Sequence, residues 1–212
     1  ANLTEIAGIA FDGCKSLKSV VIPSKVKTIG YAAFSGCSGL TSFEINSGVL
    51  EKTGSFIFYG CKNLKEVKLN GALKKIPKNM FADASYLEKV IIPKSVTSID
   101  SMSFCECNSL KSIVIPENVT YIGYSAFAGC AQLKSVVVPA KVNEIKWCAF
   151  EDCTALTSVT VKNKNVKFGV QVFRNDNNLT IKCYKNSTAH KYALDNKIKC
   201  SPTLGNSSGN TV

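Results

Sequence analysis

A phenylalanine recurs at almost constant spacing along most of the 212-residue chain. Successive members lie 23, 24, 23, 23, 23, 23 and 23 residues apart, and a leucine follows six residues after each one. The repeat phenylalanines are Phe11, Phe34, Phe58, Phe81, Phe104, Phe127, Phe150 and Phe173. A short period sustained over eight units is typical of a solenoid, in which one coil cannot bury its apolar face alone and stacking buries it.

Each repeat unit carries the pattern of one coil. Residues 17–22 alternate at their end, so that Val21 points outward between two inward side chains. This β-branched segment stops at Pro23, which cannot donate the next hydrogen bond of a sheet. A second apolar pair, Val26 and Ile29, returns the chain across the coil. The small residues before the next repeat phenylalanine predict a helical turn.

The complete pattern is Ala-Phe-x-Gly-Cys-x-x-Leu-x-x-Val-x-Ile-Pro-x-x-Val-x-x-Ile-Gly, and it resembles the BspA-like leucine-rich repeat family. Residues 126–139, with Val142 and Ile145, match it almost fully, and the resemblance covers roughly residues 3–182. It implies a leucine-rich-repeat solenoid: a curved, right-handed coil with a parallel sheet on its concave face and short helical turns or irregular structure on the other side. It also implies a cell-surface or secreted protein used in adhesion and protein binding.

Several units depart from the pattern. Asparagine replaces proline at Asn46 and Asn70, and Ala84 and Asp176 stand where other units have cysteine.

The ends of the repeat region define three segments, with a solenoid expected over residues 1–182. The segment 183–200 resembles the C-terminal cap common in the same family, with a short helix that begins after Ser187 and ends at Asn196. Residues 201–212 are rich in Ser, Gly and Asn and predict a flexible tail or linker. At the other end Leu3 and Ile6 occupy the second apolar pair of an incomplete coil. We therefore expect the natural chain to continue upstream, or a partner to cover this end.

The ten cysteines and the single histidine are the candidates for chemistry. Six cysteines follow a repeat phenylalanine by three residues, which favours a buried column of small side chains over a metal or redox array. Cys183 and Cys200 flank the cap helix and either form a disulfide or remain free thiols. His190 lies in no nucleophile motif, and no phosphate loop or metal-ligand motif occurs in the sequence. The sequence therefore predicts no enzyme, no cofactor and no metal site.

The outward strand positions predict a partner-binding face. Three consecutive units place an apolar residue ten positions after the phenylalanine, and lysines recur three positions earlier. The predicted face comprises Val21, Lys68, Ile91, Val114, Val137 and Thr160, with Lys18, Lys65, Lys111 and Lys134. The alternative is that β-branched residues simply suit half-exposed strands. Tyr31, Tyr124 and Trp147, each three residues before a repeat phenylalanine, form either an aromatic edge for binding or packing along the coil edge.

The charge balance of 26 − 15 = +11 does not indicate a nucleic-acid-binding protein. The basic residues are spread over all units, and all except Arg174 are lysines. Attraction to acidic polymers remains physically reasonable. No apolar run is long enough to span a membrane.

These features favour a non-catalytic, adhesin-like module of a cell-surface or secreted protein that binds a protein or glycan on its concave sheet face. Host extracellular matrix and acidic glycans are the candidate partners. A structural spacer that presents another domain is the main alternative. An intracellular interaction scaffold is a third, because it suits the many unpaired cysteines.

Overall fold

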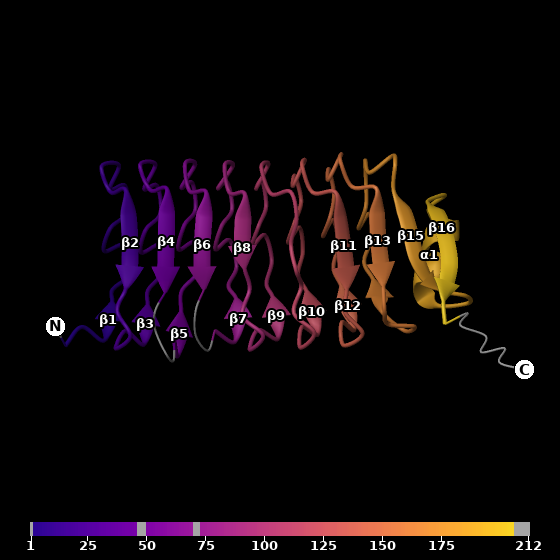
Figure 1. Cartoon of the computed structure of the whole chain (residues 1–212), viewed down its shortest axis with the longest axis horizontal. Coiled ribbons are helices and arrows are strands. Elements are labelled where there is room, and N and C mark those ends of the chain that lie inside the picture. The colour runs from indigo at the N-terminus through magenta and orange to yellow at the C-terminus, as the bar shows by residue number, and fades with distance from the viewer. Residues whose placement is uncertain (1, 46–49, 70–72, 206–212) are drawn as a thin grey trace, which may run out of the picture.

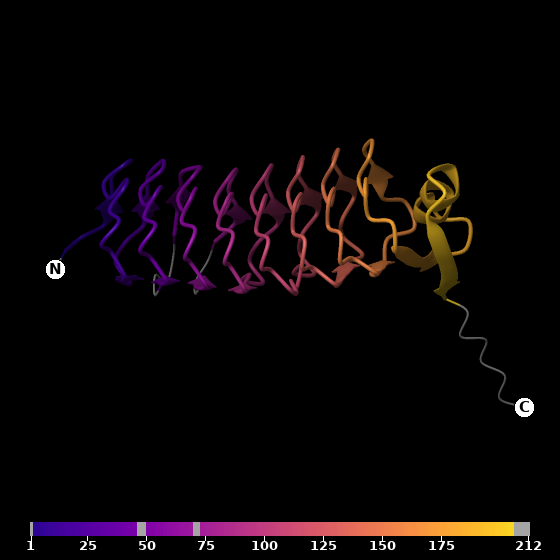
Figure 2. The same ribbon diagram turned by 90° about the horizontal axis from the view of Figure 1, so that it is seen from above.

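The computed structural model describes residues 2–45, 50–69 and 73–205, and the chain forms a parallel β-solenoid of stacked coils. Figures 1 and 2 show the coils side by side along one axis, with the two ends of the chain at opposite ends of the stack. The solenoid predicted from the repeats is confirmed. Asn46 and Asn70, where the proline is replaced, lie outside the described residues.

The longer strands form what we call the main sheet face, which consists of two four-stranded parallel sheets. The first has the order β2-β4-β6-β8 and the second the order β11-β13-β15-β16. Their bounds are β2 (Ser19–Ile22), β4 (Ser42–Ile45), β6 (Glu66–Leu69), β8 (Lys89–Ile91), β11 (Ser135–Val138), β13 (Ser158–Val161), β15 (Thr180–Tyr184) and β16 (Lys199–Leu204). Equivalent repeat positions pair in register, as Val21 does with Glu44, so the outward columns run straight across the repeats, and the register shifts only between β15 and β16.

Two-residue strands form a second ladder after the proline turns, in sheets of order β1-β3-β5 and β14-β12-β10-β9-β7. They are β1 (Glu5–Ile6), β3 (Thr28–Ile29), β5 (Lys52–Thr53), β7 (Lys75–Ile76), β9 (Ser98–Ile99), β10 (Tyr121–Ile122), β12 (Glu144–Ile145) and β14 (Lys167–Phe168).

The third side of each coil is a pair of tight turns around the repeat phenylalanine. In every coil the residues two before and two after this phenylalanine have positive φ. Glycine occupies the second position in four coils, at Gly13, Gly36, Gly60 and Gly129. A side chain there meets steric strain, so these glycines have a conformational reason to occur.

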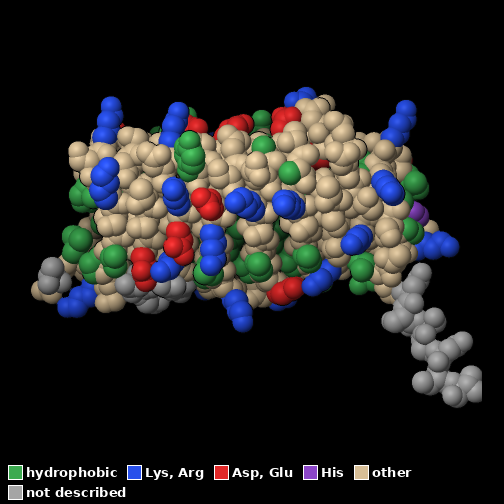
Figure 3. All heavy atoms as spheres, turned by 45° about the horizontal axis from the view of Figure 1, so that its top comes forward, with side chains coloured by type: hydrophobic (Ala, Val, Ile, Leu, Met, Phe, Trp, Pro, Cys, Tyr) green, Lys and Arg blue, Asp and Glu red, His purple; other side chains and the backbone are tan. Residues whose placement is uncertain are grey.

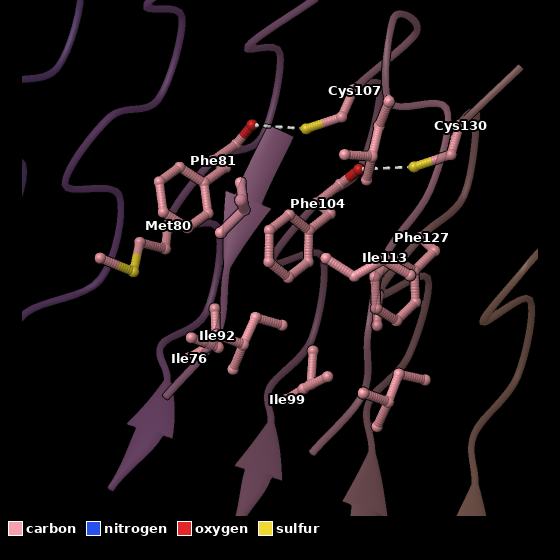
Figure 4. Packing of buried hydrophobic residues seen from close by; sticks show 14 of the residues in the cluster. Ile76, Met80, Phe81, Ile92, Ile99, Phe104, Cys107, Ile113, Phe127 and Cys130 are labelled. Atoms are coloured by element: carbon pink, nitrogen blue, oxygen red, sulfur yellow. Dashed lines mark hydrogen bonds between the residues drawn. The ribbon is translucent and has the colours of Figure 1, made fainter. Parts of the chain in front are cut away.

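The core consists of columns of identical side chains. Neighbouring repeat phenylalanines stack with ring centroids 5.0–5.9 Å apart and interplanar angles of 2–18°. Beside them, cysteine thiols donate to the phenylalanine carbonyl of the preceding coil, as Cys107 Sγ does to Phe81 O at 3.2 Å and Cys130 Sγ to Phe104 O at 3.2 Å (Figure 4). The same bond joins Cys37 to Phe11, Cys61 to Phe34 and Cys153 to Phe127. The cysteine column is thus buried packing, with Cys14 of the first coil exposed.

The helix α1 (Thr188–Asp195) and strand β16 follow the last coil. Ser187 is the N-cap and its side chain accepts a hydrogen bond from the His190 N–H, while Asn196 is the C-cap. β16 continues to Leu204, so residues 201–204 form a strand instead of the tail expected from their composition. The rest of that tail, residues 206–212, lies outside the described residues.

Candidate binding surface

The ladder of hydrogen-bonded strands on the main sheet face is interrupted in one coil. Residues 111–116 occupy the place of a strand between β8 and β11 but form none (Figure 1). Within this fully described stretch, the backbone groups of residues 112–115 make no hydrogen bond to either neighbouring coil. The interruption is confined to this face, because the Phe104 ring still stacks at 5.2 Å on the rings of both Phe81 and Phe127.

The interruption opens an apolar groove of about 620 Å³, which we call the break groove. Its lining residues come from β8, from the unpaired segment 111–116, which we call the open segment, and from the proline turns that follow each of them. They are Lys89, Val90, Ile91, Ile92, Lys94, Ser112, Val114, Ile115, Pro116, Glu117 and Asn118. Val114 is 79 % exposed, the highest value of any large hydrophobic residue that the structure describes.

The apolar residues of the predicted face gather at this groove. Ile91 and Val114 line it, and Val137 is exposed on the next strand, β11. Figure 3 shows hydrophobic side chains in a row on this face with basic side chains in a row beside them. Val21 lies at the N-terminal end of the same column and Thr160 lies beside Val137 on β13, and neither lines the groove.

Two lysines line the break groove, and two more lie at the start of the neighbouring main-face segments. Lys89 and Lys94 line the groove. Lys111 is the first residue of the open segment, and its backbone carbonyl accepts a hydrogen bond from the backbone N–H of Lys134 at 3.3 Å. None of these four ammonium groups forms an ion pair with a described residue. Glu117, the acidic residue of the groove, pairs with Lys162. Lys68 lies on β6 opposite Ile91, one strand from the groove, whereas Lys18 and Lys65 directly precede β2 and β6.

The predicted aromatic edge does not join this surface. In each coil a short strand separates the aromatic position from the main strand. Tyr31 packs its ring 5.5 Å from the Phe56 ring. Tyr124 and Trp147 are 42 % and 60 % exposed on neighbouring coils, several coils away from Tyr31.

The cysteines offer no reactive group in the core. Burial raises the pKa of Cys61 to about 12, and it raises the pKa values of Cys107, Cys130 and Cys153 well above the usual range. Their thiols therefore stay protonated and poorly nucleophilic. Cys183 and Cys200 are both free thiols, since the β15–β16 register places Cys200 opposite Ile181. No group of three or more His, Cys, Asp and Glu side chains that could hold a metal ion occurs in the described part of the chain.

Sequence reasoning found the apolar column but missed the break groove. Lys89, Lys94 and Pro116 belong to repeat positions that look alike in other coils, so position alone does not single them out. The coil of residues 104–126 has isoleucine at both inward strand positions, Ile113 and Ile115, and this is the only local signal in its sequence.

A parallel solenoid with this repeat defines a leucine-rich repeat protein. The family model "BspA type Leucine rich repeat region" matches residues 1–110 and 74–201 in six copies, and the chain belongs to this family. None of the curated proteins compared with it matches. In the part described, no helix is long and apolar enough to cross a bilayer.

Solved bacterial leucine-rich repeat proteins share the fold. The chain is 28 % identical to a leucine-rich repeat protein of T. pallidum, with 94 % of this chain and 79 % of that chain covered and a TM-score of 0.59. It is 22 % identical to the pneumococcal vaccine antigen PcpA, with 94 % and 59 % covered and a TM-score of 0.63. It is 24 % identical to a leucine-rich cell surface protein of Faecalibacterium prausnitzii, with 84 % and 64 % covered and a TM-score of 0.52. The chain thus spans less than two thirds of the length of the last two proteins.

Proposed function

We propose that the chain is a non-catalytic binding module that holds an extended, acidic segment of a partner protein on its main sheet face. An apolar side chain of the partner enters the break groove, and its carboxylates lie near Lys89, Lys94, Lys111 and Lys134. The observation that carries this proposal is the apolar groove whose two lining lysines, Lys89 and Lys94, form no ion pair with a described residue. We place the module on the cell surface or outside the cell, and the name of the F. prausnitzii neighbour calls that protein a cell surface protein.

The groove and the lysines contribute differently to such a complex. Burying one Val- or Leu-sized side chain is worth about 1.5–3 kcal/mol. An exposed ion pair is worth at most about 1 kcal/mol and weakens with salt. The apolar anchor therefore sets the affinity, and the lysines set the association rate and the preference for acidic sequences. The stacked coils are preformed, so little ordering entropy opposes binding.

The test is a binding screen of the purified chain, at physiological salt, on extracellular-matrix proteins, mucins and a library of acidic peptides that each contain one apolar residue. Val114→Asp puts a charge into the break groove at a position that is 79 % exposed, so it leaves the fold intact. Val21→Asp is the matched control, because Val21 occupies the same repeat position, is 59 % exposed and lies four coils away.

We expect a peptide or protein hit that weakens at least about tenfold in Val114→Asp, the loss of roughly one buried side chain, and persists in Val21→Asp. Equal weakening in both variants would refute the assignment to the groove. Binding that disappears with salt but ignores Val114→Asp would mean nonspecific lysine attraction. An absence of any hit would support the spacer.

A further inference from the structure

The cysteine column changes its chemistry at the last coil. In the inner coils a thiol donates to the repeat phenylalanine carbonyl that lies 26 residues earlier, as Cys153 Sγ does to Phe127 O at 3.2 Å. The same spacing leads from Phe150 to Asp176, which occupies the cysteine position of the last coil. A carboxylate only accepts hydrogen bonds, whereas a protonated carboxyl group donates one. The protonation state of Asp176 therefore decides whether the column keeps its last bond.

The Asp176 carboxylate and the Phe150 carbonyl are both buried without a hydrogen-bond partner. Asp176 is 6 % exposed, and neither of its carboxylate oxygens has a partner among the described residues. The Phe127 carbonyl accepts from the Cys130 backbone N–H at 3.2 Å and from a thiol, but the Phe150 carbonyl accepts from no described residue. Buried polar groups are normally paired. A proton on Asp176 that is donated to the Phe150 carbonyl satisfies both residues with one bond.

The charges in the preceding turn favour the protonated form of Asp176. Burial is the main cause that raises the pKa of Asp176 to about 7, and the nearby carboxylates of Asp152 and Glu151 raise it further. The Cys153 backbone N–H, which faces the carboxyl group, acts in the opposite direction and lowers the pKa. The Arg174 guanidinium does not compensate the carboxylates for Asp176, because it pairs with Glu151.

The other titratable groups near Asp176 do little for its charged form. The Cys153 thiol stays neutral because burial raises its pKa well above the usual range. Burial also raises the pKa of Tyr192, which faces Asp176 from α1. Lys197 and Lys199 line the groove between the last coil and the cap, but both are exposed, so water and salt screen their charges.

The turn that contains Asp176 is also the place where the cap docks. The Val172 N–H donates to the Tyr192 hydroxyl of α1 at 3.0 Å, and the rings of Phe173 and Tyr192 meet with centroids 6.1 Å apart. Inner turns donate their N–H groups to the next coil, as Phe150 does to the Val172 carbonyl at 2.9 Å. The last turn is followed by the cap instead of a coil, so a displacement at Asp176 passes directly to α1.

We propose that Asp176 is a pH-sensitive switch for the C-terminal cap. In its protonated form the carboxyl group donates to the Phe150 carbonyl and holds the last turn in the column, as the thiols do in the inner coils. Loss of the proton leaves a carboxylate against a carbonyl oxygen in the core, and the turn and the cap open to let water reach the charge. The switch is independent of the break groove and of the partner proposed there.

The cap should open more easily as the pH rises. The closed state holds a proton on Asp176 that the open state, in which this side chain reaches water, loses around the ordinary pKa of 3.8. The closed state is therefore favoured at low pH, and this advantage is lost between about pH 4 and about pH 7.

The experiment is amide hydrogen exchange of the purified chain at pH 5 and pH 7, corrected for the intrinsic pH dependence of exchange, with the amides of α1 as the readout. Asp176→Asn is the test variant, because its amide is similar in size and can donate at both pH values. Asp176→Cys is the second, because most coils have cysteine at this position. Asp195→Asn is the control, because it removes an exposed carboxylate of α1 itself.

We expect the protection of the α1 amides in the wild type to fall at least about tenfold from pH 5 to pH 7. Asp176→Asn and Asp176→Cys should abolish this fall, and Asp195→Asn should keep it. Exchange at pH 7 should also be insensitive to low urea concentrations, as local openings are. A wild type without the fall, Asp176 variants that keep it, or α1 exchange as sensitive to urea as that of β4 would overturn the proposal.

Discussion

Replacing Glu106 by glycine should stabilise the protein. Glu106 lies two residues after a repeat phenylalanine and has φ 59°, in a column where four other coils have glycine. The left-handed region costs a residue with a Cβ about 1–2 kcal/mol. About 0.4–1 kcal/mol of this stabilisation is lost, because glycine increases the conformational entropy of the unfolded chain. The net gain for Glu106→Gly is therefore about 0.5–1 kcal/mol.

The measurement is the thermal unfolding midpoint by circular dichroism, which should rise by about 2–3 °C for a chain of this size. Glu106→Ala is the control, because it removes the carboxylate but keeps the Cβ that causes the strain. We expect the alanine variant to lie within about 0.5 kcal/mol of wild type, as exposed substitutions usually do. An equal rise in the alanine variant would show that charge, and not backbone strain, is responsible. A lower midpoint in Glu106→Gly would refute the argument altogether.

Three further predictions concern the buried carboxylate, the cap and the thiols. Burial, with Asp152 and Glu151 nearby, raises the pKa of Asp176 from 3.8 to about 7, so the folded chain holds a proton that the unfolded chain has lost. Stability should fall as pH rises from about 4 to about 7, and Asp176→Asn should lack this part of the fall in urea titrations; an identical pH profile would contradict it. Ser187→Ala removes the N-cap acceptor of α1 and should cost about 1 kcal/mol in the same assay, whereas an unchanged midpoint would mean that the cap is not coupled to unfolding. A thiol reagent should modify exposed Cys14 in the native protein and reach Cys61, Cys107, Cys130 and Cys153 only after denaturation, and rapid native labelling of those four would contradict their burial.

The sequence predicts the columns of this fold well, because each column repeats one physical requirement. The phenylalanines, the inward strand residues and the small side chains beside them recur at fixed positions. Each is buried in almost every coil, Phe11 of the first coil being 41 % exposed. The conformation of the turn is less evident. A stretch such as 31–37 suggests a helical turn, yet its backbone has two left-handed positions, at Ala32 and Gly36. Only the glycine at the second position signals this conformation, and several coils lack it.

At the candidate site, the sequence predicts the apolar column but not the groove. The apolar column at Ile91, Val114 and Val137 follows from the register of the repeat. The interruption of the ladder between β8 and β11 does not, because it depends on small displacements of a segment whose sequence resembles its neighbours. The burial of Asp176, in contrast, follows from its place in the column that is occupied by buried cysteines in other coils.

The interrupted ladder also bears on the choice between a binding module and a spacer. A spacer is stiffest when every coil bonds to both neighbours, and here the outer strand of one coil bonds to neither over residues 112–115. The same coil exposes Val114 and lacks acidic partners for the lysines beside it, so three unfavourable features coincide at one place. A partner that contributes an apolar side chain and carboxylates would relieve two of them together. The intact stacking of Phe104 beneath the groove keeps that place rigid, so the binding energy need not be spent on ordering it.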